Sequence, residues 1–239
     1  MDVTCQSCGR SFETEPVSVY RFTFPADRFC AFCREADRVR EETRRADVLW
    51  TQARVPTDYG NASFGSFEPR PGTQHGLSLA RSWADEIRHG RRPRRGLLLH
   101  GPPGAGKTHL AVAILREAVY SAEPVRSIFL NVPDWLNGLR EAWNNDDAPE
   151  PPNPTGYELA VVDDLGAENA THWSRERLYS LLNDREQKRL LTVVTSNLTP
   201  EAIAGSLGAA AASRLTRLCA PVPLDAESDY RVAAAEAAG

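Results

Sequence analysis

A glycine-rich segment at residues 101–108, GPPGAGKT, has the composition of a loop that binds phosphate groups. Its glycines let backbone N–H groups converge on a β-phosphate, Lys107 supplies a compact cation for the β- and γ-phosphates, and the Thr108 hydroxyl is a ligand for Mg²⁺. A strand-like run precedes the loop and a helical pattern follows it, as such a loop requires. We therefore expect ATP and Mg²⁺ to bind at Gly101, Pro102, Pro103, Gly104, Ala105, Gly106, Lys107, Thr108 and His109.

Two further apolar runs end in polar side chains. Asp163 and Asp164 follow residues 159–162, which fit a central parallel strand buried on both faces. We expect Asp163 to hold the hydration shell of Mg²⁺ and Asp164 to polarise an attacking water; the alternative is a pair of helix-capping aspartates. Asn197 ends the next run and can contact the γ-phosphate or the water, although Ser-Asn is also an ordinary strand-to-helix turn.

The cysteines have the spacing of a structural metal site. Cys5 and Cys8 form one C-x-x-C pair, and Cys30 and Cys33 form another after 21 intervening residues. Each pair can direct two thiolates at one ion, so the four predict a tetrahedral Zn²⁺ site with no open position for catalysis. Because so short a segment cannot build a core, zinc is expected to supply much of its folding energy. Cys219 stands alone and is expected to be a buried small hydrophobe.

These side chains need an α/β framework to position them. Mixed charges over 34–47 predict a solvated helix, and apolar residues recur with helical period over 76–88. We expect a parallel sheet flanked by helices, preceded by a small zinc-ribbon-like module. The domains expected are a zinc-binding module and helix at 1–50, a Pro- and Gly-containing linker at 51–75 in which Phe64 and Phe67 dock, and an ATPase domain at 76–239.

The composition excludes several classes of protein. Apolar residues make up 41% and charged residues 25%, as in a globular protein rather than a disordered or fibrous one. No apolar stretch approaches the roughly 18–20 residues that span a bilayer, and the first residues do not resemble a secretory signal. We expect a cytoplasmic protein without membrane contact. A net charge of −4 argues against coating nucleic acid by bulk charge, but not against a local basic patch.

Two charged segments have open interpretations. The run from Arg88 to Arg95 contains five arginines and can contact a phosphate backbone, or it is an arginine-rich solvated loop. The stretch 144–154 is rich in proline and acidic residues, which predicts a flexible loop that would not itself grip DNA.

In chain order, the motifs resemble the DnaC/IstB-like branch of the AAA+ ATPases, which includes bacterial and phage helicase loaders and transposition helper ATPases. The resemblance covers about residues 53–231, and the run 163–168 is more particular to this branch than the phosphate loop. It is carried by GPPGAGKT, LAVVDDLGAE, VVTSNL, ASRLTRLC and a terminal DYR.

The resemblance implies roles that spacing alone does not. Asn197 corresponds to the sensor 1 residue, and Arg214 to an arginine finger that acts on the nucleotide of a neighbouring subunit, with Arg217 as the competing candidate. Arg231 lies where a sensor 2-like residue is found. The short second carboxylate, Asp164, implies slow hydrolysis that oligomerisation or DNA stimulates.

The function implied is that of an ATP-dependent helicase loader in DNA replication. It would bind a replicative hexameric helicase through residues 1–50, bind single-stranded DNA and form a homo-oligomer with ATP. The zinc module favours this over an IstB-like transposition helper, which binds duplex DNA and a transposase and typically begins with a helical segment. A third hypothesis is a zinc adaptor whose ATP site switches binding with negligible turnover.

Overall fold

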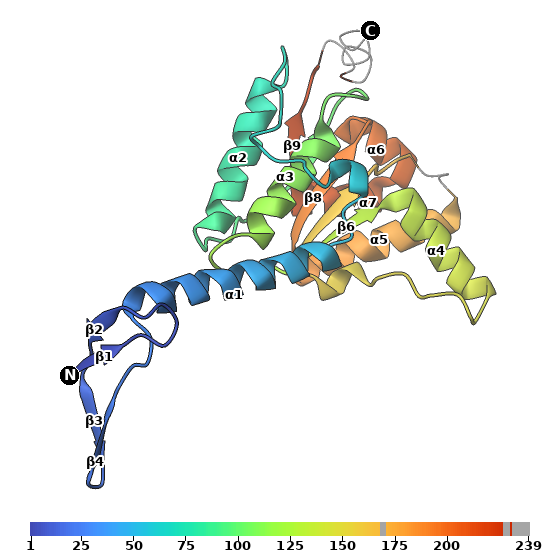
Figure 1. Cartoon of the computed structure of the whole chain (residues 1–239). Helices are drawn as coiled ribbons and strands as arrows, with labels where there is room; N and C mark the ends of the chain where they lie inside the picture. The colour runs from blue at the N-terminus through green and yellow to red at the C-terminus, as the bar shows by residue number, and fades with distance from the viewer. Residues whose placement is uncertain (168–170, 227–229, 231–239) are drawn as a thin grey trace. The chain divides into compact units, whose positions relative to one another are not determined.

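Two small hairpins and the start of a long helix make up the first 48 residues (Figure 1). The computed structural model describes residues 1–167, 171–226 and 230, and the chain divides into two units, Met1–Val48 and Leu49–Gly239. Helix α1 begins in the first unit and ends in the second. The antiparallel pairs are β1 with β2 and β3 with β4, and the bounds are β1 (Asp2–Thr4), β2 (Ser11–Glu13), β3 (Pro16–Val19), β4 (Phe22–Pro25) and α1 (Ala31–Gln52).

The apolar core of the first unit consists mainly of cysteines. Cys5, Cys30 and Cys33 are buried together, and Phe12 packs against them. The larger aromatic side chains of the β3–β4 hairpin, Phe22 and Phe24, remain exposed. Helix α1 is lined by Arg–Glu and Arg–Asp pairs at i,i+3 and i,i+4 spacing, which agrees with the solvated helix predicted from its charges. So small a cluster contributes little to folding by hydrophobic burial alone.

Five parallel strands form the central sheet of the second unit, in the order β6-β7-β8-β5-β9. Their apolar side chains are buried on both faces, as expected for a parallel sheet covered by helices. Pro221 and Pro223 lie in β9, an edge strand, where a missing N–H is tolerated. The bounds are β5 (Gly96–His100), β6 (Ser127–Asn131), β7 (Leu159–Asp163), β8 (Leu191–Ser196) and β9 (Cys219–Pro223).

Helices cover both faces of this sheet, which confirms the predicted α/β fold (Figure 1). Helix α3 packs on the strands and α2 packs on α3, while α4 to α7 share the core cluster of the opposite face. No helix in the described ranges is long and apolar enough to cross a membrane. The helices are α2 (Gln74–Arg88), α3 (Lys107–Val119), α4 (Val132–Asn144), α5 (His172–Gln187), α6 (Pro200–Leu207) and α7 (Ala209–Leu218), with 3-10 turns at Thr57–Tyr59 and Pro154–Gly156.

The segment expected to be a linker, residues 51–75, packs closely within the second unit. Ala53 O accepts a hydrogen bond of 2.7 Å from Phe129 N, and Arg116 donates to the carbonyl of Ala62 over 3.0 Å. Phe67, one of the two predicted anchors, is 9% exposed. The segment therefore packs against the ATPase fold at Ala53, Ala62 and Phe67, whose side chains are buried there.

Candidate functional site

The predicted phosphate loop connects β5 to α3 at the carboxyl edge of the sheet. Gly106 lies immediately before α3 with φ +86°, and a Cβ there would approach Phe67 Cε2 to 2.5 Å, so the position requires glycine. Lys107 is 6% exposed, and its Nζ donates to the carbonyls of Gly101 and Pro102 over 2.9 and 2.7 Å. The ammonium group is thus held against the loop that would carry the phosphates.

A hydrogen-bond network joins the loop to the first carboxylate. Thr108 Oγ1 and Thr195 Oγ1 both donate to Asp163 Oδ1, over 2.9 and 2.7 Å. Burial raises the pKa of Asp163, and the hydrogen bonds from Thr195 and Thr108 oppose that rise. Thr108 in α3 and Asp163 in β7, the two residues expected to bind Mg²⁺, therefore lie within hydrogen-bonding distance of each other.

Thr195 also fixes the backbone of Asp164. Its Oγ1 accepts a hydrogen bond of 3.0 Å from the backbone N–H of Asp164, whose φ is +58°, a conformation uncommon for residues other than glycine. One buried hydroxyl on β8 thus holds both aspartates at the end of β7. No sequence motif singles out Thr195; its one signal is a hydroxyl two residues before Asn197, near the end of the strand.

These groups line one cavity of about 430 Å³, a volume in the range of small-ligand sites. Asn197 lines it together with Asp163 and Asp164, so the structure brings the sensor 1 candidate to the carboxylates. Gly101 and Pro102 approach Lys107 through their carbonyls but do not line the cavity. The cavity is lined by Asp163, Asp164, Asn197 and the loop residues Pro103 to His109. The other lining residues are Pro56, Tyr59, Ser66, Phe67, Glu68, Arg70, Thr73, Phe129, Asn131, Asp134 and Tyr230.

His109 has a contact that its place after the loop did not predict. A ring nitrogen, Nε2, lies 2.9 Å from Ser63 O and 3.3 Å from Ser66 Oγ, and the ring meets Phe67 edge-on at 5.4 Å between centroids. His109 therefore anchors residues 63–67 over the start of α3, besides lining the cavity.

The arginine-finger candidates lie elsewhere. Arg214 and Arg217 are on α7, and both pair with Glu186, over 3.0 and 3.1 Å. Neither lines the cavity that contains Lys107. Arg231, the sensor 2-like candidate, lies outside the described residues. Its neighbour Tyr230 lines the cavity and donates its N–H to Gly104 O over 3.3 Å.

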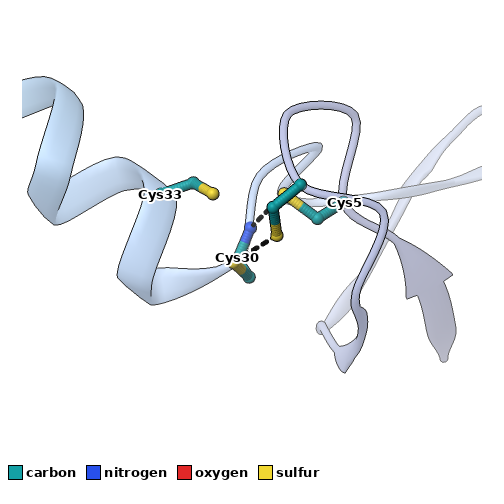
Figure 2. Close-up of side chains that lie close together, drawn as sticks. Cys5, Cys30 and Cys33 are labelled. Atoms are coloured by element: carbon teal, nitrogen blue, oxygen red, sulfur yellow. Dashed lines mark hydrogen bonds between the residues drawn. The ribbon is translucent and has the colours of Figure 1, made fainter.

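The four amino-terminal cysteines converge on one point. Their sulfur atoms all lie within 4.8 Å of one another, and Sγ of Cys8 is 3.7 Å from Sγ of Cys30. Tetrahedral Zn²⁺ with Zn–S bonds of about 2.3 Å places its sulfurs about 3.8 Å apart, so the cluster fits that ion. Figure 2 shows Cys33 on α1 with its sulfur directed toward the loop that carries Cys5.

The thiols of the cluster differ in their electrostatic environment. Backbone N–H groups of Cys30 and Cys8 lower the pKa of Cys5 from 9.0 to about 6, which favours the thiolate that binds zinc. Hydrogen bonding with the Cys8 thiol and burial instead raise the pKa of Cys33 to about 12. Cys219 lies outside the cluster, is 1% exposed, and has a pKa that burial raises to about 12. The expectation that Cys219 is a buried small hydrophobe agrees with this environment.

A family profile matches much of the second unit. The profile of a family described as "IstB-like ATP binding protein" matches residues 91–237. The DnaC helicase loader crystal structure superimposes with TM-score 0.61 and 24% identity, covering 70% of this chain and 99% of that one; DnaI gives 0.57 and 25%, covering 72% and 92%. The replication initiator DnaA of Caulobacter sp. (strain K31) is 28% identical over 145 residues, or 59% of this chain, which spans only 28% of DnaA's length.

Proposed function

The chain belongs to the family of IstB-like ATP binding proteins, within the AAA+ ATPases, and from this premise we propose that it is an ATP-hydrolysing helicase loader. The loader would bind a replicative hexameric helicase and single-stranded DNA. The observation that carries the ATPase part is the Thr108–Asp163 hydrogen bond of 2.9 Å, which joins two ligands of the expected Mg²⁺ beside the buried Lys107.

In this proposal each polar group of the cavity has one task. Lys107 binds the β- and γ-phosphates, while Thr108 and Asp163 hold Mg²⁺, which neutralises charge on the phosphate oxygens when bound. Asp164 accepts a proton from the attacking water and orients it. Asn197 contacts the γ-phosphate or the same water. The hydrogen bonds of Thr195 hold the Asp163 carboxylate and the backbone of Asp164 in place before the nucleotide arrives, so little reorganisation of these groups is needed during reaction.

The active site is completed by a second copy of the chain. Arg214, or else Arg217, reaches the γ-phosphate bound to its neighbour and stabilises charge that develops there. Their position on α7, outside the cavity of their own chain, supports a role in trans. Turnover is then slow in the isolated chain and rises on assembly.

Zinc held by Cys5, Cys8, Cys30 and Cys33 stabilises the first unit, which docks on the helicase. The four-cysteine module supports the loader over the transposition helper, because loaders of the branch that this chain resembles can carry a zinc-binding module, whereas the helpers typically begin with a helical segment. The second candidate is the transposition helper, an ATPase that binds duplex DNA and a transposase. The match to the profile of IstB-like proteins supports this candidate.

A loading assay separates these two candidates. The purified chain is mixed with the replicative helicase of its host, ATP and closed circular single-stranded DNA, and helicase that resists a high-salt wash is quantified. A loader increases the topologically trapped helicase, and Lys107→Ala removes the increase. No trapping, together with ATP-dependent binding to duplex DNA and stimulation of a transposase, would establish the helper instead.

The third hypothesis, an ATP-switched adaptor, is tested by Asp164→Asn. An amide keeps the shape of the carboxylate but loses its basicity, so ATP binding should persist while hydrolysis stops. If helicase loading by Asp164→Asn equals that of the unchanged chain, turnover has no part in the function and the adaptor hypothesis replaces the ATPase loader.

A further inference from the structure

A second hollow in the ATPase unit is rich in arginine. Its volume is about 450 Å³, and it is lined by five arginines and a single acidic residue, Glu186. This concentration of positive charge stands against a net charge of −4 for the whole chain. The lining residues are Arg92, Pro93, Arg94, Arg95, Gly96, Glu186, Arg189, Leu190, Leu191, Arg217 and Leu218.

The sheet topology assembles this hollow from distant parts of the sequence. Strands β8, β5 and β9 are adjacent and parallel, and their first residues are Leu191, Gly96 and Cys219. Arg189, Arg95 and Arg217 each come one or two residues before those starts. The arginines therefore gather at the amino edge of the sheet, whereas the nucleotide cavity lies at the carboxyl edge. A five-residue strand separates the two edges by roughly 17 Å.

Some of the arginines also build the hollow. Arg95 donates to the carbonyls of Thr216 and Cys219, and Arg92 donates to Arg189 O over 2.8 Å. These bonds satisfy carbonyl groups near the end of α7 and after α5, as basic side chains often do. These hydrogen bonds hold the guanidinium groups of Arg92 and Arg95 at the rim of the hollow. They do not neutralise the positive charge of these groups, because a carbonyl oxygen carries no formal charge.

The hollow retains most of its positive charge. Within residues 1–167, 171–226 and 230, no carboxylate lies within ion-pairing distance of Arg92, Arg94, Arg95 or Arg189. Glu186 is engaged by both Arg214 and Arg217. The exposed guanidinium groups thus form a cationic surface with one carboxylate on its border.

We propose that the arginines of this hollow other than Arg217, the alternative finger, bind the phosphate backbone of DNA, at a surface separate from the ATP site of the same chain. Planar guanidinium groups pair with phosphate oxygens through two hydrogen bonds. No aromatic side chain lines the hollow, so it offers no platform for stacking bases and contacts the backbone irrespective of sequence. Because the ATP cavity lies at the other edge of the sheet, both ligands bind at once. The inference deepens, and rests on, the DNA-handling role proposed above.

The test measures binding of fluorescent single-stranded and duplex oligonucleotides of mixed sequence to the full chain with ATP, across a salt series. The variant is Arg94→Gln with Arg189→Gln, because neither side chain donates to the carbonyls that fix the rim. The control, Arg40→Gln with Arg44→Gln, removes the same charge from exposed positions of α1. ATP affinity is measured for each protein to verify the fold.

We expect the Arg94/Arg189 variant to bind DNA about tenfold or more weakly near 0.1 M salt. The slope of log affinity against log salt should fall by about 0.7 to 0.9 for each phosphate group that the variant no longer neutralises. The control should bind like the unchanged chain. The decrease in affinity caused by the two substitutions is compared between the single-stranded and the duplex oligonucleotide. The oligonucleotide with the larger decrease is the form of DNA that the hollow binds.

Two outcomes overturn the inference, and they are distinguishable. If the unchanged chain binds DNA and the Arg94/Arg189 variant binds it with the same affinity and slope, the hollow is not the DNA surface, although the proposed function stands. If the unchanged chain with ATP binds neither oligonucleotide, the DNA part of the proposed function fails as well.

Discussion

The Thr108 hydroxyl donates a hydrogen bond to Asp163 Oδ1 over 2.9 Å, although 55 residues separate the two in sequence. The bond joins the first turn of α3 to the last residue of β7. Since Thr195 donates to the same oxygen from β8, three elements converge on one carboxylate atom. The convergence makes the consequences of single substitutions in this region specific enough to measure.

Lys107→Ala should abolish ATP binding, because it removes the ammonium that the loop holds for the phosphates. Lys188→Ala is a matched control: Lys188 is the one other lysine of the sequence, lies just after α5 at an exposed position, and donates to Thr155 Oγ1 over 3.3 Å. Nucleotide binding by calorimetry should disappear in the first variant and stay unchanged in the second. Equal ATP affinity in the two variants would show that Lys107 does not bind the nucleotide.

Thr195→Val should weaken Mg²⁺-dependent hydrolysis about 10- to 100-fold, since a hydrogen bond to a charged group is worth about 1.5–3 kcal/mol. The pKa of Asp163, already raised by burial, should rise further without the Thr195 bond. The Asp163 carboxyl would then be protonated at a higher pH than in the unchanged chain. On acidification, the variant would therefore lose activity at a higher pH than the unchanged chain does.

Thr195→Ser is the control for that substitution, because it keeps the hydroxyl and removes only a methyl group. It should restore both the Mg²⁺ requirement and the pH profile. If valine and serine variants behave alike, the hydroxyl is not what positions Asp163 and Asp164.

Cys30→Ser should release zinc and unfold the first unit, because the cysteines form its buried cluster. Metal analysis should give one Zn²⁺ per chain in the unchanged protein and none in the variant, while ATP affinity persists. Cys219→Ala, which alters the cysteine outside the cluster, should keep its zinc. A metal-free unchanged chain with an ordered amino-terminal unit would contradict the zinc site.

Arg214→Ala should reduce turnover by about 10³- to 10⁵-fold while sparing ATP binding, if its guanidinium serves the neighbouring subunit. Mixing tests this directly, under conditions in which assembly is verified. Lys107→Ala subunits carry an arginine but no working loop, and Arg214→Ala subunits carry the reverse, so a mixture should regain activity that neither has alone. An assembled mixture that stays inactive, or an Arg214→Ala chain that hydrolyses ATP normally, would contradict a shared site built on Arg214 and leave Arg217 as the next candidate.

Arg185→Leu should destabilise the ATPase unit by on the order of 3–5 kcal/mol. Arg185 is 0% exposed and donates to Pro154 O and Leu191 O, each over 2.6 Å, and to Thr192 Oγ1 over 3.0 Å. Burial lowers its pKa to about 10, and its removal leaves buried carbonyls without a donor. Urea unfolding should show this decrease in stability, whereas Arg175→Leu, on the exposed side of the same helix, should change it little.

The sequence by itself determined the chemistry of the phosphate loop, the carboxylate strand and the cysteine pairs. These are local patterns: a glycine-rich turn between a strand and a helix, or two cysteines on one tight turn, carry their geometry within a few residues. The parallel α/β fold followed from the same signals, because four-residue apolar runs alternating with helical patterns admit few arrangements.

The tertiary structure alone decided which distant side chains meet. Thr195 reaches both aspartates because β7 and β8 are neighbours in the sheet, and residues 51–75 lie on the ATPase fold because their small apolar side chains find partners there. The same ordering of strands gathers arginines from two loops and the last turn of α7 at the amino edge. Such contacts depend on strand order and register, which residue types at a single position do not encode, so one arginine becomes a buried donor at 185 and another a surface charge at 189.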